Sequence, residues 1–201
     1  YYINALNYLT KQRKLIKEDI LKYSVGYCDE GKYDGMIIIP SYDRHGRLNY
    51  FVARSFYEEL TFKKHLQAPY DGREIIGFEN LINFNEELTL VEGGFDAISI
   101  RRNCIPLFGK FLSDALVLKL IKYKPPIVNI CLDPDALNEA LNIVIRLLGV
   151  GIKVRLVEIK GDGIDANILG FKKMWKLINN TPLINDEYAF KKYIKLKLGK
   201  E

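Results

Sequence analysis

The sequence predicts an α/β protein in which a parallel sheet flanked by helices follows a smaller, mixed α/β subdomain. Two observations lead to this prediction. From residue 88 onward, short apolar runs alternate with segments of helical periodicity, which is the pattern of parallel strands joined by helices. Before that point, two apolar runs are separated by a polar, glycine-containing turn, which is typical of a hairpin.

The first half begins with a helix predicted over residues 3–24, because apolar side chains recur there at helical spacing. A break near residues 12–14 could divide it in two. Strands are expected at residues 36–39, before Pro40, and at residues 48–54, whereas the stretch 55–85 is irregular.

The second half alternates regularly between the two kinds of element. Strands are predicted at residues 88–92, 105–108, 127–132 and 154–159, and helices at residues 93–102, 113–123 and 136–148. Ser113 is the expected N-cap of the second helix. We therefore divide the chain into an N-terminal subdomain (1–85), an α/β domain (86–170) and a basic helical tail (171–201).

Composition and charge limit the class of protein. Hydrophobic residues make up 48% of the chain and charged residues 27%, a globular balance, and no apolar run is long enough to cross a bilayer. We therefore expect no membrane partner. The net charge is +5, and residues 171–201 account for it with eight lysines against three acidic residues. This tail is either a phosphate-binding face or a solvated helix, and the sequence leaves both readings open.

The three cysteines, Cys28, Cys104 and Cys131, lie far apart and lack the spacing of a zinc site. We therefore expect them to be reduced thiols in the core, and we expect a cytoplasmic protein. If the protein is viral, the cytoplasm is that of the host cell. The chain opens without an initiator Met, and we interpret it as part of a longer protein.

Five acidic residues are predicted to gather at one edge of the sheet. Glu92 ends the first strand and Asp96 starts the next helix, Asp133 and Asp135 follow the third strand, and Asp165 follows the fourth. In an open parallel sheet, ligands bind at the carboxyl ends of the strands. Two carboxylates about 4 Å apart repel each other by roughly 4 kcal/mol at an effective dielectric near 20. Such an edge therefore needs bound cations or protonation, and carboxylate oxygens suit Mg²⁺ or Mn²⁺.

A simpler interpretation competes with this one, because an acid at the end of a strand is more often a helix cap. Asp133 could cap the following helix, and Asp96 could stabilise the first turn of its own helix. Three acidic elements that each follow an apolar strand, in this order, favour the metal site. Gly93 and Gly94 are expected to leave room there for a phosphate backbone.

Three segments resemble the motifs of TOPRIM domains, which occur in DnaG-type primases, topoisomerases and some nucleases. They are LVEGGFDAISI (90–100), CLDPDA (131–136) and GIDANIL (163–169). The resemblance covers about residues 86–170. It implies catalysis by Glu92, Asp133 and Asp135. It also implies a set of metal ligands, namely Glu92, Asp96, Asp133, Asp135 and Asp165. The chain departs from the pattern at Asn167, where many primases carry a second Asp.

Among the TOPRIM families, the first half of the chain resembles primases. It is more similar to phage primases than to bacterial ones. The similar segments are residues 8–29, 35–56 and 63–81. The resemblance implies contacts to nucleotide or template by basic residues, namely Arg44, Arg47, Arg54, Lys64, Arg73 and Lys110. Arg44 and Arg47 could equally belong to an ordinary charged turn.

The implied function is that of a primase core, a nucleotidyltransferase that makes short RNA primers in DNA replication. Its partners would be a single-stranded DNA template, ribonucleoside triphosphates and a replicative helicase. Glu92 would act as a metal ligand or as a general base. Two alternatives stay open, a TOPRIM nuclease that cuts DNA and a non-catalytic module that binds single-stranded DNA or docks a helicase. A topoisomerase is disfavoured, because it needs a further domain with a nucleophilic Tyr.

Overall fold

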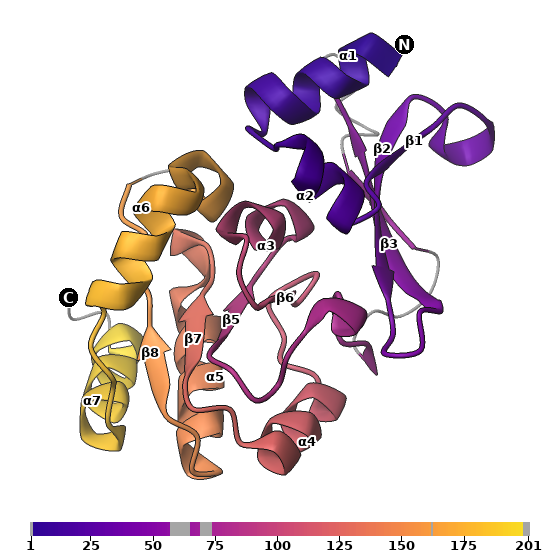
Figure 1. The fold of residues 1–201 in the computed structure, drawn as a ribbon. Helices are drawn as coiled ribbons and strands as arrows, with labels where there is room; N and C mark the ends of the chain where they lie inside the picture. Colours follow the sequence, from indigo (N-terminus) through magenta and orange to yellow (C-terminus); the bar gives the residue numbers. More distant parts are fainter. Residues whose placement is uncertain (1, 57–64, 69–73, 162, 199–201) are drawn as a thin grey trace.

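The computed structural model describes residues 2–56, 65–68, 74–161 and 163–198 (Figure 1). The architecture is mixed α/β, with a four-stranded antiparallel sheet followed by a four-stranded parallel sheet that is flanked by helices. The fold class predicted from the sequence is therefore confirmed.

The N-terminal segment is helical and is broken where the sequence indicates. Three short segments precede the first strand: α1 (Tyr2–Asn7), the π-helix η1 (Tyr8–Gln12) and α2 (Lys17–Lys22). The helix is interrupted between Gln12 and Lys17, close to the predicted break. A buried carboxylate fixes this segment to the parallel-sheet half, because Arg101 pairs with Asp19 at 2.9 Å.

The antiparallel sheet contains the predicted hairpin. Its strands, in spatial order, are β1 (Gly26–Cys28), β2 (Met36–Tyr42), β3 (Leu48–Ser55) and β4 (His65–Gln67), and a 3₁₀ turn, η2 (Gly31–Tyr33), joins the first two. Three details differ from the prediction. Strand β1 was not expected. Strand β4 lies in the stretch expected to be irregular, and β2 continues through Pro40. The proline is tolerated because β1 pairs with β2 only as far as Ile38, so no neighbouring strand needs a Pro40 N–H on that side.

The parallel sheet follows the predicted alternation of strands and helices. Its strands are β5 (Leu88–Val91), β6 (Cys104–Pro106), β7 (Val128–Cys131) and β8 (Val154–Leu156), in the order β6-β5-β7-β8, and every pair is parallel. All four predicted strands are present in a shorter form. Because β5 and β7 are neighbours, the residues that follow them reach the same edge of the sheet.

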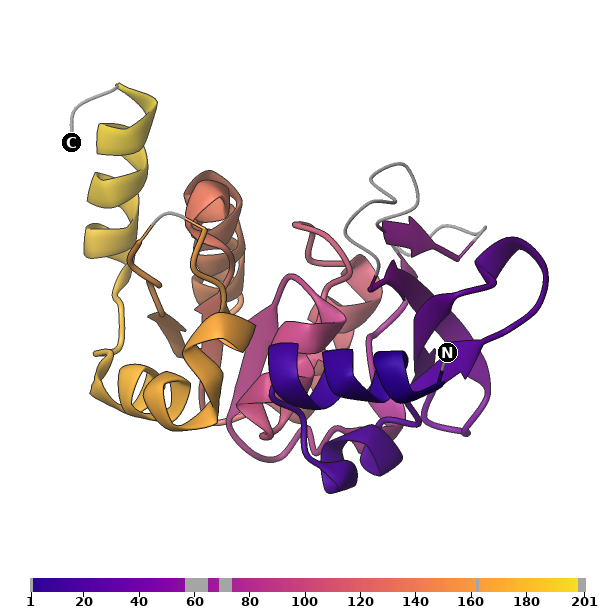
Figure 2. The same ribbon diagram turned by 90° about the horizontal axis from the view of Figure 1, so that it is seen from above.

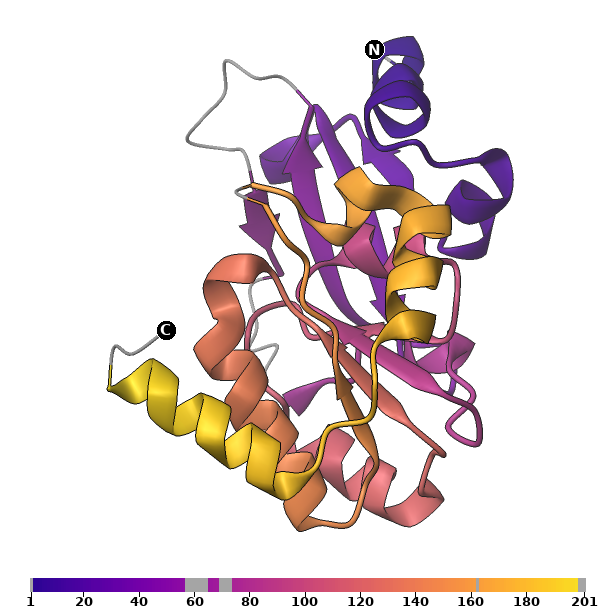
Figure 3. The same ribbon diagram turned by 90° about the vertical axis from the view of Figure 1, so that its left-hand side faces the viewer.

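Helices cover both faces of the parallel sheet (Figures 1 and 3). One face packs against α3 (Gly94–Ile100) and α6 (Ala166–Asn180), and the other against α4 (Asp114–Tyr123) and α5 (Leu137–Gly149). Helix α7 (Asp186–Lys197) packs on α5, and two further 3₁₀ turns are η5 (Glu79–Leu81) and η6 (Pro134–Ala136). The predicted cap of α4 is confirmed, because the Ser113 hydroxyl accepts a hydrogen bond from the Leu116 N–H at 3.1 Å.

A shared hydrophobic core fixes the two sheets to each other. Ile37 and Ile39 of β2 belong to the same buried cluster as Val91 of β5 and Ile98 of α3. Seen from above, η1 and the antiparallel sheet adjoin α3 (Figure 2). This packing brings Arg13 and Arg54 of the first half to the edge of the parallel sheet.

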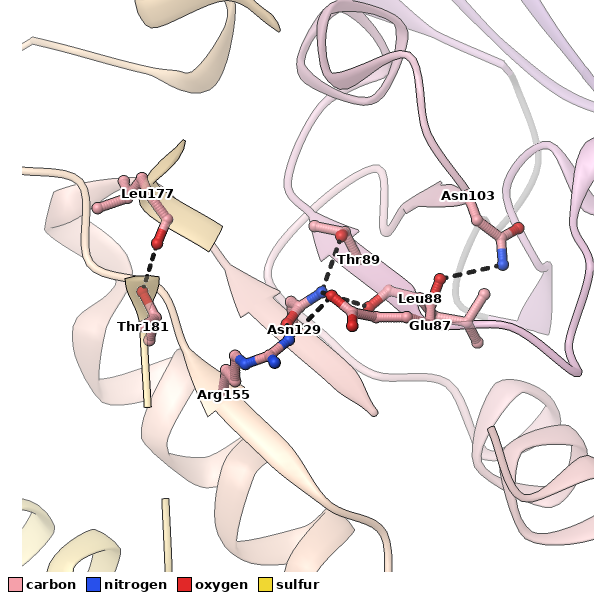
Figure 4. A network of polar contacts seen from close by, with 8 residues as sticks. All are labelled: Glu87, Leu88, Thr89, Asn103, Asn129, Arg155, Leu177 and Thr181. Carbon is pink, nitrogen blue, oxygen red and sulfur yellow. Dashed lines mark hydrogen bonds and ion pairs between the residues drawn. The ribbon is translucent and has the colours of Figure 1, made fainter. Parts of the chain in front are cut away.

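A buried polar network lies at the opposite edge, where the parallel strands begin (Figure 4). The fully buried Asn129 amide donates to the Glu87 carboxylate (2.9 Å), to the Leu88 oxygen (3.1 Å) and to the Thr89 hydroxyl (3.2 Å). Arg155 of β8 donates to Glu87 at 2.9 Å. The network satisfies polar groups that would otherwise destabilise the sheet, and it lies away from the acidic edge.

After α6 the chain passes along the outer strand of the parallel sheet. The Ile184 N–H donates to the Val154 oxygen at 2.9 Å, and these two residues form an isolated antiparallel bridge. Within the described residues, no helix is long and apolar enough to span a membrane. Cys28, Cys104 and Cys131 are free thiols, as predicted, although Cys28 is only half-buried.

Candidate active site

Three of the predicted acids converge at the carboxyl edge of the parallel sheet. Glu92 directly follows β5, whereas Asp133 and Asp135 follow β7. One carboxylate oxygen from each residue lies within 4.8 Å of the other two, which is close enough for the three to share one cation. The strand neighbours Val91 and Cys131 are paired in the sheet, and this register sets the approach of the acids.

Glu92, a member of this group, has an unsatisfied carboxylate oxygen. Its Oε2 atom is buried and accepts no hydrogen bond from the residues that the structure describes. Burial, followed by the negative charge of Asp133, raises the pKa of Glu92. A buried carboxylate oxygen without a partner is costly, and a divalent cation would satisfy it. The donor set therefore fits Mg²⁺ or Mn²⁺.

The two aspartates of the CLDPDA segment have different environments. Asp133 precedes η6, but in the described structure its side chain makes no capping hydrogen bond, so the simpler cap interpretation does not account for it. Burial and the charge of Asp165 raise the pKa of Asp133. The exposed Asp135 accepts a hydrogen bond from the Lys110 ammonium at 2.8 Å, which holds the pKa of Asp135 below its usual value. Lys110 thus lies beside the acids.

Asp96 and Asp165 line the same cleft but lie outside the close group of three. Asp165 caps α6, since its carboxylate accepts from the Ile168 N–H at 2.7 Å. Asp96 accepts from the Asn167 N–H at 3.2 Å. Burial, followed by the charge of Asp165, raises the pKa of Asp96 to about 7. The Asp96 carboxylate thus joins α3 to α6, and the Asp165 carboxylate caps α6.

Asn167 has a structural role in the described chain. It is buried, and its amide nitrogen donates to the Ser99 hydroxyl at 2.6 Å and to the Arg13 backbone oxygen at 3.0 Å. Its amide oxygen accepts from the Arg13 guanidinium at 3.1 Å. An Asp side chain could not donate the first two bonds, so the departure from the primase pattern at this position is matched by its surroundings.

Arg13 is a cleft residue that the sequence analysis missed. It reaches the cleft from the break after η1 and lies over the rings of Phe95 (4.7 Å) and Tyr8 (5.3 Å). Its only sequence signal is the predicted helix break near residues 12–14. The positive charge of Arg13 is close enough to act on Asp96, whose pKa it lowers against the larger effect of burial.

The cleft itself has a volume of about 380 Å³ and is walled by both sheets. Arg54 of β3 lines it, and the buried Arg54 Nε atom has no hydrogen-bond partner among the described residues. A buried guanidinium N–H facing a cleft of carboxylates is suited to bind an anionic ligand. The structure thus places Arg54 in the wall of the cleft, and its contact with nucleotide or template stays a prediction.

Two further predicted basic residues, Arg44 and Arg47, are not brought to the cleft. Arg44 and Arg47 belong to the turn at the far end of the hairpin, where Asp43 accepts from the Arg47 backbone N–H at 2.9 Å and pairs with its guanidinium at 3.6 Å. Their surroundings are those of an ordinary charged turn. Lys64 and Arg73 lie outside the described residues.

The two glycines after Glu92 have a different reason from the one expected. A Cβ atom at Gly93 would lie 2.7 Å from the Asp96 carboxylate, and one at Gly94 would lie 3.2 Å from the Ile39 side chain. Glycine thus leaves room for the Asp96 side chain at position 93 and for close packing of α3 on β2 at position 94. The expectation of room for a phosphate backbone is not needed to explain either residue.

Solved structures of primases share this fold. A DnaG primase catalytic domain bound to single-stranded DNA superposes with a TM-score of 0.77 at 17% identity, over 96% of this chain and 76% of that one. The Aquifex aeolicus primase, comprising zinc-binding and RNA polymerase domains, gives 0.72 at 19% identity over 87% of this chain. The chain spans 55% of that structure's length. The protein therefore has the TOPRIM-type fold of a DnaG primase catalytic core.

Among curated sequences, the chain is 30% identical over 178 residues to the uncharacterized protein MG010 of Mycoplasma genitalium. The match covers 84% of this chain and 80% of that protein, and the chain belongs to the MG010 family. No protein-family profile matches the sequence.

Proposed function

We propose that this protein is a primase core that synthesises short RNA primers on single-stranded DNA by metal-dependent nucleotidyl transfer. The observation that carries the proposal is the convergence of Glu92, Asp133 and Asp135 within 4.8 Å at the carboxyl edge of a primase-like sheet. The primase fold supports it, and so does the unsatisfied, buried oxygen of Glu92.

In this proposal Glu92, Asp133 and Asp135 hold Mg²⁺ or Mn²⁺. Such a bound cation lowers the pKa of an attacking hydroxyl and offsets the charge of a triphosphate. Arg54 and Arg13 face the same cleft and would bind the phosphates of a ribonucleoside triphosphate. Lys110 would exchange its partner Asp135 for a phosphate oxygen when a nucleotide binds.

The same proposal covers the template, the partner, the cellular setting and the division into domains. It includes the single-stranded template, a replicative helicase as partner, a cytoplasmic setting and the division into residues 1–85, 86–170 and 171–201. Asp96 and Asp165 remain proposed outer ligands, which would have to give up or share their present hydrogen bonds. The greater similarity to phage primases than to bacterial ones stays a prediction.

The test is template-directed RNA synthesis on short single-stranded DNA with labelled ribonucleotides and Mg²⁺ or Mn²⁺. We expect primers from the wild-type protein and none from the double variant Asp133→Asn/Asp135→Asn. Calorimetric titration of both proteins with Mn²⁺ should show that the variant loses the ion. Cleavage of the template without synthesis would favour the nuclease. DNA binding without Mn²⁺ binding would favour the non-catalytic module.

A further inference from the structure

Two further hollows lie between the acidic cleft and α7. A smaller hollow of about 70 Å³ shares Asp133 with the cleft and extends over Leu137 at the start of α5 to Glu158 after β8. A third hollow, of about 490 Å³, shares Leu137 and Glu158 with the second and reaches α7. Because each hollow shares lining residues with the next, the three are neighbours in a row from the acids to α7, and we call this row a groove.

One face of α7 forms the far wall of this groove. Its lining residues recur at the spacing of a single helical face: Tyr188, Lys191, Lys192 and Lys195. The buried Ala189 on another face of α7 packs against α5, as Figure 3 shows for the two helices. The lysines of this face are therefore directed into the groove by the packing of the helix.

The groove combines an apolar floor with a positive rim. Leu137, Leu196 and the Tyr188 ring supply apolar surface. The acid on the floor is Glu158, and Lys192 forms an ion pair with it. Lys191 pairs only with the exposed Glu187 one turn earlier, a solvated contact of little strength, and no acidic partner of Lys195 is present among the described residues.

We infer that this groove, called here the α7 groove, binds a single strand of nucleic acid that continues from the acidic cleft. Apolar and aromatic surface accommodates bases, and lysines at the rim bind the phosphates that connect them. The inference rests on the proposed function, because that function places a nucleic-acid strand in the acidic cleft from which the groove continues. It also gives a role to the basic tail, because three of the lysines that the structure describes there line this groove.

The experiment measures the affinity for labelled oligothymidylates by fluorescence anisotropy in EDTA, over a range of salt concentrations. The variant is Lys191→Gln/Lys195→Gln, and the control is Lys172→Gln/Lys173→Gln, which removes the same charge from exposed positions of α6 outside the groove. Each phosphate contact on a single strand contributes about 0.7 to the slope of log K against log salt. We therefore expect the groove variant to lower the slope by about 1.4 and the control to leave it unchanged.

Length dependence adds a second readout. Oligomers too short to reach α7 should not distinguish the wild type from the groove variant, and longer ones should. Equal slopes for the two double variants at every oligomer length would overturn the inference. This holds even if α7 turns out to bind another ligand, such as an acidic protein. Because no metal is present, this result is independent of primer synthesis. A protein that makes no primers could still pass the binding test, and an active primase could fail it.

Discussion

The Arg13 guanidinium donates to the Asn167 amide oxygen at 3.1 Å, and the Asn167 amide nitrogen donates back to the Arg13 backbone oxygen at 3.0 Å. These residues are 154 positions apart in the chain. Their reciprocal bonds fix the break after η1 to the first turn of α6, so they determine where a positive charge stands over the acidic cleft.

Replacing Asn167 by Asp should destabilise the metal-free protein. The carboxylate would add negative charge beside Asp96 and could not donate to Ser99 or to the Arg13 oxygen. We expect a loss of about 1–3 kcal/mol in the free energy of unfolding in EDTA, and a smaller loss with Mn²⁺. Denaturant unfolding measures both. Asn185→Asp is the control, because Asp can also cap α7 there. Equal losses in both variants would contradict the prediction.

The stability of the metal-free protein should fall as pH rises from about 4 to about 7. Asp96 has a pKa of about 7 in the folded protein and an ordinary value of 3.8. In this window the folded state keeps a proton that the unfolded state has lost, so rising pH favours unfolding. The upper limit is roughly 4 kcal/mol, at about 1.4 kcal/mol per pKa unit.

The variant Asp96→Asn tests this assignment by denaturant unfolding across the same pH range in EDTA. The fall in stability should be much shallower than in the wild type, with only Glu92 and Asp133 left to contribute, since their pKa values are also raised. A variant with the wild-type slope would show that Asp96 is not the group responsible.

Lys110→Gln should bind Mn²⁺ more tightly and nucleotide more weakly. Lys110 now occupies an oxygen of Asp135, so its removal frees that carboxylate for a cation. The same change removes a positive charge from the nucleotide's path. We expect a several-fold decrease in the Mn²⁺ Kd by calorimetry and a several-fold increase in KM for ribonucleotides. Lys122→Gln, on the exposed side of α4, is the matched control and should change neither quantity.

Arg155→Met should lower stability without affecting DNA binding. The change removes a donor from Glu87 and leaves that carboxylate partly unsatisfied at the opposite edge of the sheet from the acids (Figure 4). The expected loss is about 1–3 kcal/mol in the free energy of unfolding. Lys153→Met, exposed two residues earlier, should cost little. A variant of normal stability with impaired DNA binding would contradict this division between the two edges.

The parallel sheet and its three converging acids could be predicted because the information is local. Apolar runs mark β5 and β7, and parallel strands bring Glu92 and Asp133 to one edge whatever the details of packing. The length of β2 beyond Pro40 was not predictable in this way. It depends on where β1 stops, which is a property of the assembled sheet.

The finer structure of the site depends on contacts that no local pattern contains. Arg13 was missed because its partner Asn167 is supplied by the other end of the chain. The sequence grouped Asp165 with the other acids, but the start of α6 uses it as a cap. Gly93 was interpreted through a ligand, whereas the Asp96 side chain occupies the space a Cβ would need.

The bridge between Val154 and Ile184 has a consequence for how the protein can be handled. The outermost strand of an open sheet presents unpaired amides to any extended peptide nearby, and this invites association between molecules. Here the linker to α7 occupies part of that position. A shortened chain that ended after α6 would uncover the strand, so we expect it to self-associate even though its acidic edge is unchanged.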